Sequence, residues 1–188
     1  MADVAGHIAV GALFAIPAWF FWSRRPAIVF IGITIISALL PDSDLYLRKV
    51  FPTIHHHGVT HTLLFTVLVS LIGGAIAAVV LPDYLNQKWF PERSLDRETV
   101  FVFCGSAFFL GSLSHIFADM LSAPDIASRL EPLWPLVNGQ IVTLDVYYYN
   151  SPLVNFGLLA VTLVIHAVLY WQDGYQITDR YTVGRESS

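Results

Sequence analysis

The chain has 188 residues, of which 55% are hydrophobic and 13% are charged, and its formal net charge is −4 at pH 7. Soluble domains carry about 25% charged residues, so a composition this poor in charge indicates a membrane protein. The negative charge and the lack of basic clusters exclude nucleic acid as an electrostatic partner, and the single cysteine, Cys104, excludes a disulfide framework or a multi-cysteine metal site.

Five apolar segments follow one another along the chain, with polar or proline-containing stretches between them. A helix needs roughly 20 residues to cross the hydrocarbon core of a bilayer, and four of the segments reach this length. The second is shorter, and it spans only if Arg24 and Arg25 snorkel to the headgroups and the chain just outside stays helical. We expect it to span, because a spanning segment gives a consistent topology. The segments occupy residues 4–22, 27–40, 62–81, 100–121 and 153–171.

This pattern predicts an all-α integral membrane bundle of about five transmembrane helices. Residues 1–188 are expected to form one domain, with a polar tail over about 173–188. The first segment lacks a positively charged stretch ahead of its apolar residues, so we expect a retained first helix and not a cleaved signal peptide. Across five spans, seven lysines and arginines fall on one side and three on the other. The positive-inside rule places the larger set in the cytoplasm and the N-terminus outside.

Residues able to bind a metal ion gather near the ends of four of these segments. Because consecutive membrane helices alternate in direction, the four ends lie on the same, outer side. His7 lies in the opening turns of the first segment, and Asp42 and Asp44 follow the second. The stretch HHHGVTH precedes the third segment, and His115 and Asp119 lie in the last turns of the fourth. The metal-ligand candidates are His7, Asp42, Asp44, His56, His57, His61, His115 and Asp119.

The chemistry of these side chains suits zinc. Imidazole nitrogen and carboxylate oxygen bind zinc, and a catalytic site adds water at an open position. His115 and Asp119 are four residues apart on a helix, so their Cβ atoms lie about 5–6 Å apart on one face and both can reach one ion. His56 or His57, together with His61, would approach from the start of the next helix. The set predicts one or two zinc ions, with manganese as the alternative, and two-metal sites suit in-line displacement at phosphorus.

Each of these features also has an ordinary structural explanation. The histidine run fits a wet interfacial loop, the two aspartates fit caps of the turn after Pro41, and the i,i+4 pair fits a hydrogen bond between neighbouring helices. His7 alone would fit a packed core histidine, and we interpret His166 in that way. Ionisable residues are rare inside membrane segments and usually functional, so their joint occurrence at one face favours a functional site.

Four short motifs occur in order along the chain, namely AGHIAVG at 5–11, LLPDSD at 39–44, HHGVTHT at 56–62 and SHIFADML at 114–121. Together with LWPL at 133–136, they resemble the LexA-binding, inner-membrane-associated metal-dependent hydrolases. That family is similar to the zinc-dependent phospholipase C and P1 nuclease superfamily, and the resemblance implies a multi-pass protein of the cytoplasmic (inner) membrane. It implies as metal ligands His7, one of Asp42 and Asp44, His56 or His61, His115 and Asp119, with Asp119 as a bridge.

The chain departs from these enzymes at two points. The family usually carries Arg after the first His of its H-x-G-x-T-H element, where this chain has His57. A basic phosphate contact is therefore weakened, or a ligand is added. The soluble enzymes also carry a second H-x-x-x-D that completes three metals. Downstream of Asp119, His166 is followed four residues later by Tyr170, so a third zinc ion is not expected.

The leading hypothesis is a membrane-bound, metal-dependent hydrolase that cleaves a phosphoester, with a phospholipid or a lipid-linked phosphate as substrate. A bound zinc ion lowers the pKa of its water to about 7, and Asp42 or Asp44 would act as the general base. The stretch 122–149 is expected to cover the site as an interfacial lid. One alternative is a divalent-metal transporter, whose site usually lies near the bilayer midplane. The other is a non-catalytic protein with a closed, structural metal site.

Overall fold

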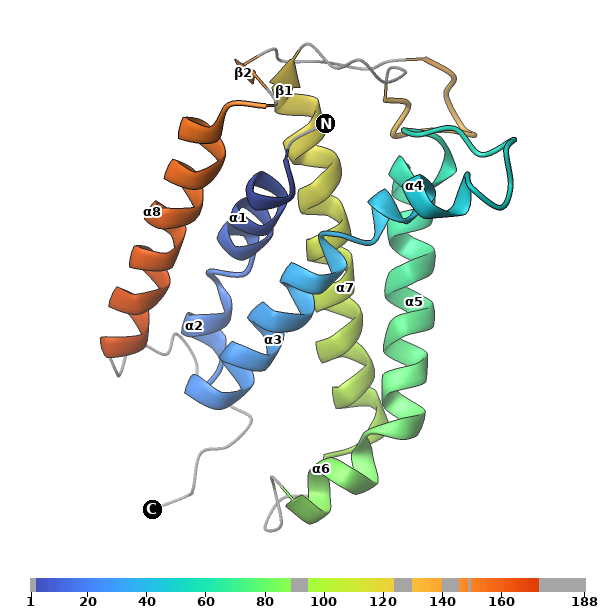
Figure 1. Cartoon of the computed structure of the whole chain (residues 1–188). Coiled ribbons are helices and arrows are strands. Elements are labelled where there is room, and N and C mark those ends of the chain that lie inside the picture. Colours follow the sequence, from blue (N-terminus) through green and yellow to red (C-terminus); the bar gives the residue numbers. More distant parts are fainter. Residues whose placement is uncertain (1–2, 89–94, 124–129, 140–145, 149, 173–188) are drawn as a thin grey trace.

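The architecture is a bundle of long helices that lie side by side (Figure 1). The structure is a computed structural model, and it describes residues 3–88, 95–123, 130–139, 146–148 and 150–172. Its elements, in chain order, are α1 (Val4–Phe14), α2 (Ala18–Phe21), α3 (Arg24–Ser37), the 3-10 turn η1 (Pro41–Ser43), α4 (Asp44–Leu47), the 3-10 turn η2 (Val59–His61), α5 (Leu63–Val80), α6 (Pro82–Lys88), α7 (Arg97–Leu121), β1 (Ser122–Ala123), β2 (Tyr147–Tyr148) and α8 (Pro152–Trp171).

Five stretches of the described chain are helical, long and apolar enough to cross a membrane. This confirms the predicted all-α membrane bundle, because hydrocarbon forces each backbone polar group to bond within its own helix. The five spans are Val4–Phe21, Arg24–Leu47, Leu63–Val80, Arg97–Leu121 and Pro152–Trp171.

The first span is interrupted by a proline. Asp3 caps α1, because its carboxylate accepts a hydrogen bond from the Val4 amide at 2.7 Å. Pro17 lacks an N–H and would break the hydrogen bonds of a continuous helix, so α1 ends before it and α2 begins after it. α1 packs against α3, α7 and α8, and its first turns therefore lie inside the bundle.

The second span is longer than its apolar segment. It begins at Arg24, and η1 and α4 extend the helical chain beyond α3 as far as Leu47. These two extensions give the segment the length that crossing a bilayer requires, in agreement with the expectation that it spans. The Arg24 guanidinium lies 4.8 Å from the centre of the Tyr170 ring, which attaches the start of α3 to the end of α8.

Small residues let α7 approach both α5 and α3 closely. A Cβ added at Gly74 of α5 would lie 3.1 Å from the Cα of Gly105, so these two glycines set the distance between the helices. α3 crosses α7 at Gly111, where a Cβ would collide with Ser37 and with the Thr34 carbonyl oxygen. α7 is therefore the central helix, and the position of its last turns is fixed by these crossings.

α8 packs on α1 at the outside of the bundle. His166 joins the two spans, because the Trp19 indole N–H donates to its Nδ1 at 2.6 Å and its Nε2 donates to the Ala12 carbonyl oxygen at 2.9 Å. This agrees with the interpretation of His166 as a packed structural histidine. Between α7 and α8, β1 and β2 form a short parallel pair in which Ser122 lies opposite Tyr147.

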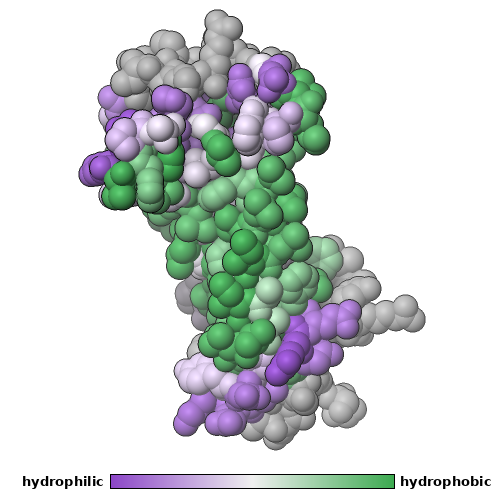
Figure 2. All heavy atoms as spheres, turned by 90° about the vertical axis from the view of Figure 1, so that its right-hand side faces the viewer, coloured by the Kyte–Doolittle hydropathy of each residue, from purple (hydrophilic) through white to green (hydrophobic). Residues whose placement is uncertain are grey.

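The surface is apolar over the middle of the bundle and polar at both ends (Figure 2). Exposed side chains of α5 contribute to this band, among them Leu68, Leu71, Ile72 and Ile76. A broad apolar band between two polar ends matches the hydrocarbon core of a bilayer. The two polar ends therefore mark the levels of the lipid headgroups.

Candidate metal centre

Four parts of the chain bring the predicted ligands together at the α4 end of the bundle (Figure 1). α1 supplies His7, η1 and α4 supply the two aspartates, the segment before α5 supplies the histidine run, and the end of α7 supplies the last pair. His7, Asp44, His61 and His115 are 0% exposed, and Asp119 is 2% exposed. Burial of so many ionisable groups is unfavourable unless they pair with one another or with a cation.

Two imidazole nitrogens and two carboxylate oxygens lie close together in this cluster. His61 Nε2 lies 3.1 Å from His115 Nε2, and each of these nitrogens lies 3.6 Å from Asp42 Oδ1. Asp119 Oδ2 lies 3.1 Å from His115 Nε2 and 3.7 Å from His61 Nε2. Donors held tetrahedrally by zinc at about 2.0–2.1 Å are separated by about 3.3 Å. These five separations lie near that edge length, so His61 Nε2 and His115 Nε2 form one triangle of donors with Asp42 Oδ1 and another with Asp119 Oδ2.

Hydrogen bonds behind both imidazoles turn their Nε2 lone pairs toward each other. The His115 Nδ1–H donates to the Ala38 carbonyl oxygen at 2.7 Å. His61 Nδ1 lies 3.1 Å from Thr60 Oγ1 and 3.3 Å from Asp44 Oδ2. The Thr60 hydroxyl donates its proton to Asp44 Oδ2 at 3.1 Å, so it can only accept a hydrogen bond from His61 Nδ1–H. The lone pair of His61 is therefore on Nε2. Two lone pairs that face each other repel unless a proton or a metal ion lies between them.

The charges around His61 favour its protonated form in the metal-free protein. Burial lowers the pKa of His61, but the carboxylates of Asp42, Asp44 and Asp119 outweigh burial and raise the pKa to about 9. Imidazole binds metals in its neutral form, so an ion bound by His61 would take the place of this proton.

Asp44 lies behind His61 and is not one of the four donors. Its Oδ1 accepts a hydrogen bond from His56 Nδ1 at 3.0 Å, and its Oδ2 accepts from Thr60. From the sequence, Asp42 and Asp44 are equally good candidate ligands. In the structure, Asp42 is a donor, whereas Asp44 is a supporting group behind His61. A carboxylate behind a ligand histidine fixes the orientation of the ring and increases its basicity.

Replacing Asp44 by asparagine is expected to weaken zinc binding by about 10–100-fold, the range for outer-shell partners of ligand histidines. The amide keeps the size of the side chain but loses the negative charge behind His61. Calorimetric titration of the metal-depleted protein with zinc measures the change. Thr60→Ser keeps the hydroxyl and should bind as the wild type does. Equal affinities of Asp44→Asn and the wild type would contradict this supporting role.

A second group of donors faces the other oxygen of Asp119. His7 Nε2 lies 3.4 Å from Asp119 Oδ1, and the His7 ring stacks on His115 with 3.7 Å between the ring centres and 6° between the planes. Neither ring nitrogen of His7 has a hydrogen-bond partner among the described residues, which is uncommon for a buried polar group. Asp119 thus has one oxygen toward each donor group, the arrangement that a bridge between two ions requires.

The structure distinguishes the three adjacent histidines of the HHHGVTH stretch. His55 is exposed, His56 turns to the aspartate of α4, and His57 is buried with Nε2 3.8 Å from Asp119 Oδ2. His57 has a φ of 63°, a conformation that non-glycine residues rarely adopt. Gly58 follows it, at a position where a Cβ would lie 2.8 Å from the His55 carbonyl oxygen. This tight turn directs His57 toward the cluster.

The predicted lid over residues 122–149 is described only in part. Residues 124–129, 140–145 and 149 lie outside the described residues. In the described part, Leu130 is buried, and the Pro132 carbonyl oxygen accepts a hydrogen bond from the Leu63 amide at 2.8 Å. This bond attaches the stretch to the start of α5, two residues after His61, and the covering role stays a prediction.

Two supporting groups are absent from the sequence-based set, namely Thr60 and the Ala38 carbonyl. Thr60 belongs to the H-x-G-x-T-H element, so its position between two histidines could have identified it from the sequence. A backbone carbonyl such as that of Ala38 carries no side-chain signal. Its role depends on the close crossing of α3 and α7, which only the folded chain defines.

A comparison with protein families identifies this chain at the level of the family. The YdjM inner membrane protein family matches residues 1–180. Searches of curated proteins and of solved structures found no match. The family description agrees with the five apolar helices and with the expected membrane. The chain therefore belongs to the YdjM inner membrane protein family and is a multi-pass protein of the inner membrane.

Proposed function

We propose that the protein is a membrane-bound, metal-dependent hydrolase that cleaves a phosphoester of a phospholipid or of a lipid-linked phosphate. The observation that carries this proposal is the buried cluster in which Asp42, His61 and His115 form one donor set and His7, His115 and Asp119 form another. Paired metal sites suit in-line displacement at phosphorus.

The donor set fits zinc. Zinc binds mixtures of imidazole and carboxylate, whereas calcium and magnesium prefer sites built from oxygen alone. Manganese, which also accepts carboxylate and imidazole, is the alternative. Asp42, His61 and His115 form one set that would hold an ion, and His7, His115 and Asp119 form another.

Zinc in such a site supplies a bound water with a pKa of about 7. Asp42 is the residue best placed to take up the proton of that water. It is 8% exposed, compared with 0% for Asp44 and 2% for Asp119, and because its Oδ1 belongs to the donor set, its Oδ2 would take the proton. Asp44 has both oxygens engaged by His56 and Thr60, so we assign it to the orientation of His61.

Apolar side chains at the same end favour a substrate in the headgroup layer. The segment that runs from α4 to η2 exposes large apolar side chains, with exposed fractions from 55% to 70%. They are Tyr46, Val50, Phe51 and Val59. Such side chains beside a polar loop suit the interface between lipid and water, so the donor cluster would lie at the level of lipid phosphates. The lysine and arginine count supports an extracytoplasmic position of this end.

The burial of the donors favours a second candidate, a non-catalytic protein whose metal ion ties helices together. Structural zinc sites are closed by four protein ligands, whereas catalytic sites keep a position for water. Each of the two donor sets has three protein residues and leaves such a position, which favours the hydrolase. A transporter has less support, because the metal-capable groups of the described chain all gather at one end and not near the midplane.

Hydrolysis of bis(p-nitrophenyl) phosphate and of fluorescent phospholipids by the purified, zinc-saturated protein tests this proposal. Asp42→Asn is expected to lower kcat by about 10²–10⁴-fold, the range for the loss of a general base. Zinc content measured on the same samples separates lost catalysis from lost metal. His55→Ala, at an exposed neighbour of the cluster, should keep the wild-type rate. A fully zinc-loaded wild type that turns over no phosphoester would favour the structural candidate instead.

A further inference from the structure

A row of imidazole rings runs from the loop before α5 into the bundle. The distances between ring centres are 4.3 Å from His56 to His57, 4.8 Å from His57 to His61 and 5.0 Å from His61 to His115. The His7 ring stacks on His115 and ends the row. The exposed fraction of the side chains falls from 10% at His56 to 2% at His57 and 0% at His61. The row therefore connects the surface of this loop with the buried metal centre.

The outer end of the row is itself a set of metal donors, which we call the outer set. It consists of His56, His57 and His61, each with one nitrogen within 4.8 Å of the nitrogens of the other two. His56 Nδ1 donates to Asp44 Oδ1 at 3.0 Å, so the lone pair of His56 is on Nε2. Neutral imidazole is a common ligand of zinc, so the outer set suits a divalent transition-metal ion.

The backbone of His57 supports a functional role for the outer set. A φ of 63° is unfavourable for a residue with a side chain, and glycine adopts it most readily. Glycine comes one position later, at Gly58, so the chain holds a histidine in the strained conformation. Strain of this kind concentrates at functional sites. Here the result is a buried imidazole whose Nε2 lies 3.8 Å from Asp119 Oδ2.

The outer set and the inner centre share one nitrogen. His61 belongs to the outer set and also to the set that it forms with Asp42 and His115. Because His61 Nδ1 donates to the Thr60 hydroxyl, Nε2 holds the only lone pair of the ring. One lone pair binds one ion, so the two sets cannot hold separate ions with all of their ligands. The outer set is thus suited to transient binding and not to a resident ion of its own.

Asp119 lies within reach of both sets. Its Oδ2 is 3.8 Å from His57 Nε2, 3.7 Å from His61 Nε2 and 3.1 Å from His115 Nε2. A carboxylate in this position can remain a ligand while one imidazole replaces another. It therefore offsets the cost of moving a charge into the buried part of the cluster.

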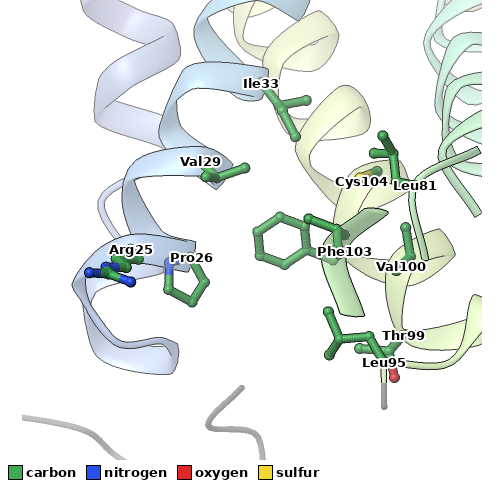
Figure 3. Close-up of a pocket in the computed structure, with 11 residues that line it drawn as sticks. Arg25, Pro26, Val29, Ile33, Leu81, Leu95, Thr99, Val100, Phe103 and Cys104 are labelled. Atoms are coloured by element: carbon green, nitrogen blue, oxygen red, sulfur yellow. The ribbon is translucent and has the colours of Figure 1, made fainter. Parts of the chain in front are cut away.

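Among the described residues, the opposite end of the bundle has no comparable set of donors. An apolar pocket lies there between α3 and the start of α7 (Figure 3). Hydrocarbon side chains such as Val29, Ile33 and Phe103 line it, and they cannot replace the hydration shell of an ion. From Thr99 at this pocket to His115, α7 advances by about 24 Å at 1.5 Å per residue. The imidazole row is therefore the better route for an ion to reach the centre.

We propose that the outer set is an entry site, in which His56 and His57 capture a divalent transition-metal ion and pass it to the inner centre by exchange of ligands around His61. Each exchange replaces one ligand by another, so the ion keeps ligands throughout its passage into the interior. This entry role rests on the metal centre of the proposed function but not on hydrolysis. His56 and His57 thus control the rate of metal uptake and not the final occupancy.

Stopped-flow absorbance of the full-length, metal-depleted protein in detergent, mixed with cobalt(II), tests this entry role. Cobalt accepts the same nitrogen and oxygen ligands as zinc, and its visible absorption changes with the ligands bound. For the unaltered protein, the observed rate is expected to rise with cobalt concentration and then level off, because passage from the outer set becomes limiting. A rate that stays proportional to cobalt concentration would indicate direct binding at the centre and would overturn the proposal.

His57→Asn and His56→Asn test the two entry residues. Asparagine tolerates a positive φ, so the first variant keeps the turn. In the second, the amide can still donate to Asp44, so the support behind His61 remains. Each variant should lower the initial slope of rate against cobalt concentration by about tenfold, equal to about 1.4 kcal/mol of activation free energy. The cobalt content at equilibrium should equal that of the wild type.

His55→Asn is the matched control, because His55 belongs to the same histidine run but is exposed and lies outside the outer set. It should take up cobalt at the wild-type rate. Unchanged rates in both entry variants would contradict the proposal, and so would the loss of a whole ion at equilibrium, which would make the replaced histidine a resident ligand. Uptake is measured without a phosphoester, so a protein that loads in two steps but hydrolyses nothing would contradict the hydrolase alone. A protein that takes up no cobalt would contradict both.

Discussion

Alanine in place of Asp119 is expected to remove the bound metal from the purified protein. Asp119 faces His61 and His115 through Oδ2 and His7 through Oδ1, so its loss takes a ligand from both donor groups at once. Elemental analysis should give one or two zinc or manganese ions per chain for the wild type and close to none for Asp119→Ala. Adding His115→Ala should make the loss complete, because His115 belongs to both donor sets.

His55→Ala is the matched control for this experiment. His55 belongs to the same histidine run but is exposed, so this variant should keep its full metal content. Full metal content in the double variant at His115 and Asp119 would mean that the centre is assigned to the wrong residues. A wild type that stays metal-free after zinc is added would remove both the hydrolase and the structural candidate.

Alanine in place of Gly111 is expected to lower the free energy of unfolding by about 3 kcal/mol, the upper part of the usual range for overpacking. The added Cβ would collide with Ser37 and with the Thr34 carbonyl oxygen, and it would lie 3.0 Å from the Ala38 amide nitrogen. Backbone atoms cannot rotate away, so α3 must move off α7. That movement would also draw the Ala38 carbonyl oxygen away from His115 Nδ1, and zinc affinity should fall together with stability.

Thermal unfolding in detergent and zinc titration measure both effects of Gly111→Ala. Gly157→Ala on α8 is the control, because no atom lies within 4 Å of the Cβ it would add. Alanine is also more favourable than glycine inside a helix by up to about 1 kcal/mol, so the stability of this variant should be unchanged or slightly higher. Wild-type unfolding of Gly111→Ala would contradict the close crossing of α3 and α7.

Hydropathy and helix direction are sufficient to predict the outline of this fold. Each of the five apolar segments belongs to a span, because a lipid-exposed backbone must satisfy its hydrogen bonds within a helix. The ends of the second span are harder to predict. Arg24 and Arg25 make the first turn of this span look like a polar loop. Pro41 suggests that the helix ends before it, whereas the chain continues as a 3-10 turn with the proline at its first position.

The candidate site is predictable as a group of residues but not as a geometry. Alternating helix direction is enough to bring the ligands to one end of the bundle. The separate positions of Asp42 and Asp44 depend on η1, because a 3-10 turn rotates successive side chains by about 120°. The inward position of His57 depends on its positive φ. Neither backbone conformation can be deduced from residue types alone.

The donors of the metal centre come from distant parts of the chain, from His7 in α1 to Asp119 in α7. An unfolded chain cannot present them together, so an ion held by them binds the folded protein alone. By thermodynamic linkage, such an ion stabilises the fold by about 4 kcal/mol when its free concentration is about 1,000 times its dissociation constant. Under the proposed occupancy, the lifetime of this protein in the membrane would follow the supply of zinc in the cell, and scarcity would expose the chain to proteolysis.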